Sequence, residues 1–273
     1  MLFFVISAIA VVMAEGTGRI PAGAGLAVPS LSTNLLKLLQ AISTVTIFLI
    51  PAWLFASYSF RNKPFHRLGF NPATKNSFYI LAVALLLLSF PLDGWLGQLN
   101  REIPLPAWMI QREQDAGRQI ADFLKTGSVS GVLVNLFVIA LLPAICEEAC
   151  FRGALQPILI RIFKSPWGGI IVTAMIFSAF HFQFQGFLTR MLLGILLGAA
   201  YWYSGSLWVS ITAHFFTNAV QVIAVAWYPG FAATDPTVPV YAALISLVIV
   251  AGLLLIMRNL SASDHSRDYP KEI

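Results

Sequence analysis

The stretch that decides the fold is residues 129–160, VSGVLVNLFVIALLPAICEEACFRGALQPILI. It is longer than the roughly 20 apolar residues that one membrane-spanning helix needs. Its only charged residues are Glu147, Glu148 and Arg152. The stretch predicts a long membrane helix of which only the middle lies in hydrocarbon. Proline removes a backbone donor, so Pro143 predicts a kink in this helix.

The composition of the whole chain supports the same interpretation. Of its 273 residues, 58 % are apolar and 11 % are charged, whereas soluble domains have about 45–50 % and about 25 %. The mean hydropathy is +0.78. The core of one soluble domain could not bury so much apolar area. A disordered chain would not contain so much of it. We therefore expect an all-α, polytopic transmembrane helix bundle: a single integral membrane domain over residues 1–273, with a core at about 129–227 and a polar tail at 259–273.

Eight apolar segments are expected to form about eight membrane helices. The first segment, Leu2–Ala14, is short. It resembles a signal peptide but lacks a positively charged start, so a short helix is favoured. The connection Trp108–Lys125 mixes apolar and charged residues, which fits either an amphipathic helix at the membrane interface or a solvated helix. The segments are Leu2–Ala14, Leu35–Phe60, Phe78–Gly97, Val129–Ile160, Trp167–Phe182, Phe187–Tyr203, Leu207–Trp227 and Val240–Met257.

The charge of the chain limits the classes of partner that it can bind, and its cysteine content is low. The net charge is +5 and the pI about 9.4, but the basic residues are scattered over short loops, so we expect no nucleic acid partner. The expected location is the lipid bilayer of a prokaryotic cell (inner) membrane. Cys146 and Cys150 are the only cysteines, and they are interpreted as small buried residues.

Charged groups in membrane segments are costly, which makes them functional candidates. Glu148 and Arg152 are four residues apart with the acid first, the favourable order for a helical ion pair. Glu147 is then left without a local partner. A desolvated, unpaired carboxylate suits a general base. The alternative for all three residues is an ion network that packs helices.

Two histidine clusters follow in later segments. His181 lies near the end of the apolar segment Trp167–Phe182. His214 and Asn218 are four residues apart and share one helix face. Each cluster by itself also fits hydrogen bonding between helices.

Together the clusters supply the groups needed to hydrolyse an acyl bond. Glu147 would deprotonate a water that His181 orients, and His214 with Asn218 would donate hydrogen bonds to the oxyanion. The same Glu147, His181 and His214 have the residue types of a His₂Glu zinc site. Residue types alone leave both possibilities open.

The clusters have the patterns Glu-Glu-x-x-x-Arg, Phe-x-x-x-His and His-x-x-x-Asn, at residues 147–152, 177–181 and 214–218. In this order, within membrane helices, they resemble the CPBP family of type II CAAX prenyl endopeptidases and their bacterial relatives. That family includes proteases linked to bacteriocin processing and immunity. The resemblance covers residues 133–225, about a third of the chain, and all polar motif positions are intact.

The resemblance implies an intramembrane endopeptidase acting on a membrane-associated protein or peptide. It implies that Glu147 and His181 activate water, that His214 and Asn218 stabilise the oxyanion, and that Glu148 and Arg152 support the site. The family has been described both as glutamic proteases and as metalloproteases. We favour the glutamic mechanism, which requires no cofactor, because Glu147 is left free as a base; zinc remains the alternative.

Two other functions are compatible with the same residues. Some members of the family act as membrane scaffolds or immunity proteins without catalysis. Buried Glu and His residues are also found in proton-coupled transporters. The transporter is disfavoured because no inverted repeat is visible.

Overall fold

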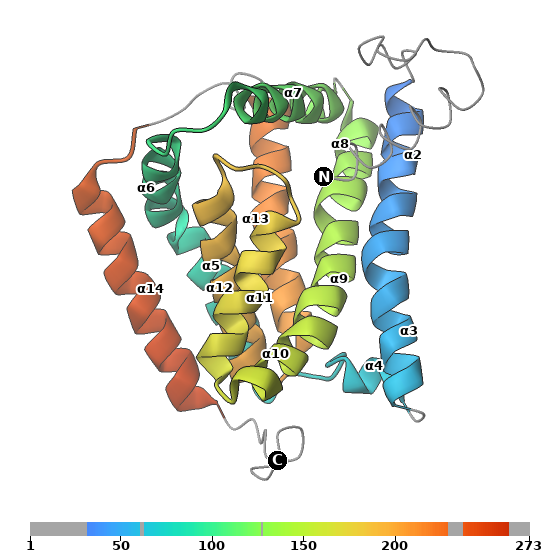
Figure 1. Ribbon diagram of the computed structural model, residues 1–273, viewed down its shortest axis with the longest axis vertical. Coiled ribbons are helices and arrows are strands. Elements are labelled where there is room, and N and C mark those ends of the chain that lie inside the picture. Colours follow the sequence, from blue (N-terminus) through green and yellow to red (C-terminus); the bar gives the residue numbers. More distant parts are fainter. Residues whose placement is uncertain (1–31, 61–62, 127, 229–236, 262–273) are drawn as a thin grey trace.

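The computed structural model describes residues 32–60, 63–126, 128–228 and 237–261. Every regular element in these ranges is a helix, and the helices form a bundle whose one end is crossed by α7 (Figure 1). The expected all-α membrane bundle is confirmed. The expected first segment, Leu2–Ala14, lies outside the described residues, as does most of the polar tail.

The helices of the described ranges follow one another along the chain. In chain order they are α2 (Thr33–Thr44), η1 (Val45–Leu49), α3 (Ile50–Ser59), α4 (Pro64–Arg67), α5 (Ser77–Leu88), α6 (Phe90–Arg101), α7 (Ala107–Leu124), α8 (Val129–Asn135), η2 (Leu136–Leu141), α9 (Leu142–Glu148), η3 (Ala149–Leu155), α10 (Gln156–Phe163), α11 (Pro166–Ala179), α12 (Phe187–Ser204), α13 (Leu207–Trp227) and α14 (Val240–Leu260).

Four helices in the described part of the chain are long and apolar enough to cross a membrane. They are Thr33–Ser59, Val129–Phe163, Leu207–Trp227 and Val240–Leu260. A fifth span results if α5 and α6, which are bent by 40° relative to each other, are taken together. All seven expected segments within the described ranges are helical over most of their length, but the expected number of about eight membrane helices is not confirmed.

In the described part of the chain, three π-helical segments interrupt the two longest helices, and each precedes a proline. Pro51, Pro143 and Pro157 are each the second residue of the α-helix that follows η1, η2 or η3. The residue before each proline donates to the carbonyl five residues back. Proline lacks an N–H and crowds the preceding turn, and the wider π turn accommodates both effects. The irregularity expected at Pro143 is therefore a π segment in a continuous helix.

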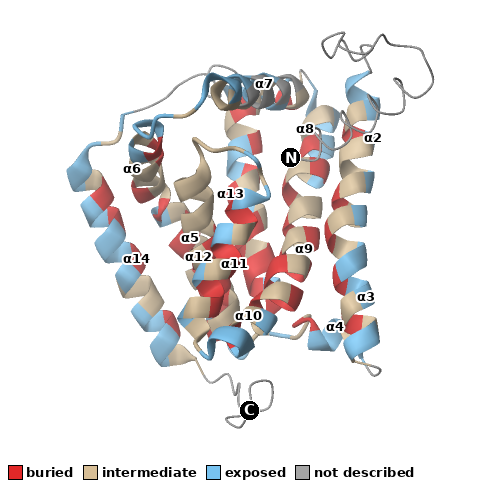
Figure 2. Ribbon diagram, in the orientation of Figure 1, coloured by how far each residue is buried: buried red, intermediate tan, exposed pale blue. Residues whose placement is uncertain are grey.

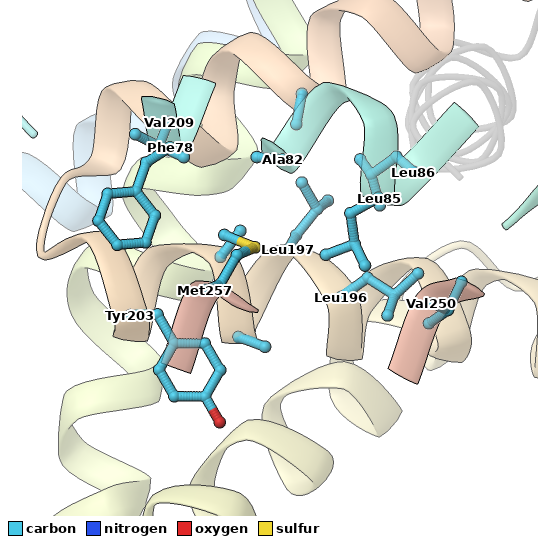
Figure 3. Packing of buried hydrophobic residues seen from close by; sticks show 13 residues of the cluster. Phe78, Ala82, Leu85, Leu86, Leu196, Leu197, Tyr203, Val209, Val250 and Met257 are labelled. Carbon is cyan, nitrogen blue, oxygen red and sulfur yellow. The ribbon is translucent and has the colours of Figure 1, made fainter. Parts of the chain in front are cut away.

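The apolar core lies where α5, α12, α13 and α14 meet. Phe78 and Leu85 of α5 pack with Leu197 of α12, Val209 of α13 and Val250 of α14 (Figure 3). Buried residues concentrate on the central helices α9, α11, α12 and α13, whereas α14 and α3 expose much of their surface (Figure 2). Exposed apolar side chains on outer helices are expected where lipid is the solvent.

Candidate active site

A fully buried ion pair joins Glu148, the last residue of α9, to Arg152 in η3. Arg152 Nη1 lies 2.6 Å from Glu148 Oε1, and neither side chain has exposed surface. Arg152 Nη2 donates to the carbonyl oxygen of Gly194 on α12 at 3.2 Å. The guanidinium also lies over the ring of Phe177, 4.7 Å from the ring centre. The ion pair expected from the spacing is present, and it ties the long helix to α12.

His214 of α13 contacts the same carboxylate. Its Nδ1 lies 2.9 Å from Glu148 Oε1. The Glu148 carboxylate, which is paired with Arg152, can only accept hydrogen bonds. His214 Nδ1 therefore carries the donated proton, and Nε2 is the ring nitrogen that remains for the cavity. The sequence did not predict this contact, which fixes the ring of His214 from behind.

His181 lies in the connection between α11 and α12, two residues beyond the end of α11. The expectation that it lies inside the apolar helix is therefore wrong by about half a turn. Its Nδ1 lies 2.9 Å from the carbonyl oxygen of Phe177, which can only accept, so Nε2 is again the free nitrogen. Burial, and next the positive charge of Arg190, lower the pKa of His181 to about 3. The imidazole is accordingly neutral near pH 7.

Each of the three clusters contributes at least one polar group to the wall of one cavity of about 470 Å³. Glu147 from α9, His181, and His214 and Asn218 from α13 all contribute to its wall. Among the described residues, Glu147 has neither a hydrogen-bond nor an ion-pair partner, whereas Asn218 Nδ2 makes only a long, 3.5 Å contact with a main-chain oxygen of η2. The cavity thus gathers the carboxylate of Glu147, two imidazoles and an amide.

The amphipathic helix α7 crosses one end of the bundle (Figure 1) and contributes to the wall of the cavity. Its apolar residues Ile120, Phe123 and Leu124 line the cavity, and Leu124 is buried. The expected helix in this connection is present. The part of its apolar face that contains Leu124 packs against the other helices of the bundle.

Three further charged residues line the cavity and were not predicted from the sequence: Lys37 of α2, Asp93 of α6 and Arg190 of α12. Arg190 donates hydrogen bonds to the main-chain and side-chain oxygens of Gln183. Lys37 and Arg190 lie within apolar segments of the sequence. Their positions inside the expected segments Leu35–Phe60 and Phe187–Tyr203 were the signal that could have identified them.

The zinc alternative requires that Glu147, His181 and His214 converge on one ion. In the described ranges, no group of three His, Cys, Asp or Glu side chains is arranged to hold a metal. These residues as placed do not fit a zinc site, and we derive no step through a metal.

Fold and site together define the class: a polytopic α-helical membrane protein with an internal cavity that gathers carboxylate, imidazole and amide groups. Residues 129–220 match the family model described as "Type II CAAX prenyl endopeptidase Rce1-like". This range is therefore similar to the Rce1-like family, and the resemblance expected from the motifs is confirmed for it. The matched range includes α8 to most of α13 and all residues of the three clusters.

Two curated proteins are each similar to a part of the chain. An uncharacterized protein YpbD of Bacillus subtilis (strain 168) is 33 % identical over 90 residues, 32 % of this chain and 43 % of that protein. An uncharacterized 24.3 kDa protein of Escherichia coli is 29 % identical over 124 residues, 42 % of this chain and 51 % of that protein. The chain thus spans about half the length of these relatives. No solved structure matches it.

Proposed function

We propose that the chain is an intramembrane endopeptidase that hydrolyses a peptide bond of a membrane-associated protein or peptide. The observation that carries the proposal is the convergence of Glu147, His181, His214 and Asn218 on one cavity. The Rce1-like match, whose description names an endopeptidase, supports it. The cavity lies inside a bundle of apolar helices, so its polypeptide substrate would also reside at the membrane.

The proposed reaction begins with water activation. Glu147 takes a proton from a water that lies beside His181 Nε2. The resulting hydroxide attacks the scissile carbonyl carbon. Asn218 donates to the developing oxyanion. His214, whose Nδ1 is held by Glu148, donates to the same oxyanion from Nε2. Glu147 then passes its proton to the leaving amine, which separates as the carbon–nitrogen bond breaks.

The test compares protein termini in host membranes. Cells lacking the native protein are complemented with wild type, with Glu147→Ala, or with Glu102→Ala, a control that removes an exposed carboxylate at the end of α6. Expression is adjusted to equal membrane levels. We expect a defined new N- or C-terminus with wild type and Glu102→Ala that is missing with Glu147→Ala.

The same comparison distinguishes the non-catalytic alternative. Identical terminal profiles, together with full rescue of the deletion phenotype by Glu147→Ala, would contradict the endopeptidase and support a scaffold or immunity protein. The cleavage site, if present, identifies the substrate and provides a synthetic peptide for kinetics.

A further inference from the structure

The connection that carries His181 has a conformation that needs support. Residues 180–186 link α11 to α12, and Phe182, which follows His181, has φ = 51°. A bulky residue in the left-handed region is strained, and such strain persists only where surrounding contacts hold it. Phe182 itself is half exposed, at 52 %, so packing of its own ring does not supply all of that support.

Asn100 of α6 holds this connection at two points. Its Nδ2 donates to the carbonyl oxygen of Phe184 at 2.8 Å, and its Oδ1 accepts from the backbone N–H of Leu188 at 2.7 Å. Asn100 is only 2 % exposed. One buried amide therefore bridges the connection to the first turn of α12, with both of its functional ends occupied.

Other contacts support the connection from neighbouring elements. Glu113 of α7 accepts from the backbone N–H of Gln185 at 2.9 Å. Ser178 of α11 donates to the carbonyl oxygen of Phe187 at 2.7 Å. Asn100 and Glu113 both lie before residue 129, and so outside the range that matches the Rce1-like family model. Elements beyond that range thus hold the segment that presents His181 to the cavity.

Asn100 is expected to hold the connection more firmly than Glu113 does. It makes two bonds instead of one, and it is buried within α6, whereas Glu113 comes from the helix that crosses one end of the bundle. Loss of a buried bidentate amide leaves a main-chain donor and a main-chain acceptor without partners. The connection would then relax, and His181 Nε2 would shift relative to Glu147.

We propose that Asn100 is a positioning residue for His181, which acts by clamping the connection between α11 and α12. The proposal rests on the proposed endopeptidase, since it gives His181 a catalytic task. A misplacement of about 1 Å can cost on the order of a hundredfold in rate, so we expect the clamp to affect kcat far more than KM.

The first experiment measures the clamp without using activity. Full-length wild type, Asn100→Leu and Asn135→Leu are compared by amide hydrogen exchange in lipid nanodiscs. Asn135 is a matched control: it is equally buried, at 1 %, but donates to the carbonyl oxygen of Leu124 at the end of α7. We expect exchange in the peptide covering residues 182–190 to rise on the order of tenfold in Asn100→Leu only.

The second experiment uses a synthetic peptide that spans the cleavage site found in the comparison of termini. We expect kcat to fall at least about tenfold in Asn100→Leu with little change in KM, and Asn135→Leu to keep the wild-type kcat. Asn100→Ser, whose side chain is too short for both bonds, should lie between the two. It carries the test if Asn100→Leu fails to insert.

Each outcome has a separate meaning. Unchanged exchange at residues 182–190 would overturn the clamp. Faster exchange with unchanged kcat would overturn the positioning role. Wild type that fails to cleave any peptide would overturn the proposed function, while the exchange data would still decide whether Asn100 holds the connection.

Discussion

At the residue scale, two adjacent carboxylates have opposite surroundings. Glu148 is fully buried and binds both Arg152 and His214. Glu147 faces the cavity and has no hydrogen-bond or ion-pair partner among the described residues. Successive helical residues point about 100° apart. Glu148 can therefore support the structure while its neighbour Glu147 stays available as a base.

This difference predicts distinct phenotypes for the two conservative substitutions. Glu148→Gln leaves the buried charge of Arg152 without its counter-charge, so we expect about 3–5 kcal/mol of destabilisation in addition to lost activity. Glu147→Gln breaks no ion pair and should keep the unfolding midpoint of wild type. Denaturant unfolding of both purified variants in one detergent checks this, and equal midpoints for the two would contradict the assignment.

The environment of His181 predicts a pH dependence of stability. Its pKa falls to about 3 in the folded protein, first because of burial, whereas an unfolded histidine titrates near about 6.5. Below that value the unfolded state binds more protons, so stability should decline as the pH falls from about 6.5 towards 3. His181→Gln should flatten this part of the profile. Thermal unfolding at several pH values tests it; parallel profiles would show that His181 does not contribute.

The glutamic mechanism predicts indifference to chelation. Wild type that is dialysed against EDTA should cleave the synthetic peptide at its original rate, and added Zn²⁺ should not raise it. Loss of activity on dialysis that only Zn²⁺ restores would instead support the metalloprotease alternative, with Glu147, His181 and His214 rearranged around the ion.

At the element scale, close packing of α12 against the long helix and α11 positions Arg152. A Cβ at Gly194 would lie 2.8 Å from Ala174 Cβ and 3.0 Å from its Cα, so the backbones would have to move apart. Gly194 also provides the carbonyl oxygen that Arg152 binds. The ion pair, and through it His214, therefore depends on this glycine.

Gly194→Ala should consequently destabilise the protein by about 1–3 kcal/mol and reduce activity. Gly252→Ala on α14 is the matched control, because nothing lies within 4 Å of its added Cβ, and it should be neutral or stabilising by up to about 1 kcal/mol. The unfolding midpoints of the two variants measure the effect. A Gly194→Ala variant as stable and active as Gly252→Ala would refute this role of the contact.

The sequence predicted elements better than contacts. Apolar length is a local property, and the expected segment Leu207–Trp227 coincides with α13 to the residue. The spacing of Glu148 and Arg152 predicted their ion pair because both residues lie on one helix. His214 binds Glu148 across 66 residues of sequence, and such a contact depends on how helices pack, which no single segment encodes.

The same limit explains what was missed in the site. Asn100 was passed over because its segment was expected to end at Gly97, and an asparagine beyond a helix end is an ordinary loop residue. His181 was placed inside a helix because hydropathy continues to Phe182, although the backbone turns after Ala179. Hydropathy detects apolar length, and it does not detect a break whose hydrogen bonds come from another helix.

At the scale of the whole molecule, the bundle makes a polar cavity possible within an apolar protein. Outer helices such as α14 expose apolar side chains, while α9, α13 and the connection after α11 place Glu147, His181, His214 and Asn218 on the wall of one cavity. The helix α7 crosses one end of the bundle (Figure 1), and three of its apolar residues line the cavity. A restricted volume of this kind admits an extended segment of polypeptide more readily than a folded domain.

The most direct measurement is the initial rate of peptide cleavage by purified wild type and Glu147→Gln, reconstituted in identical lipid vesicles at equal protein content. A general base contributes about 10²–10⁴-fold to a rate. The account predicts a loss of that size for Glu147→Gln, with the peptide cut at the same bond by wild type. Cleavage by Glu147→Gln at the wild-type rate would contradict the account, because water activation would then not depend on Glu147.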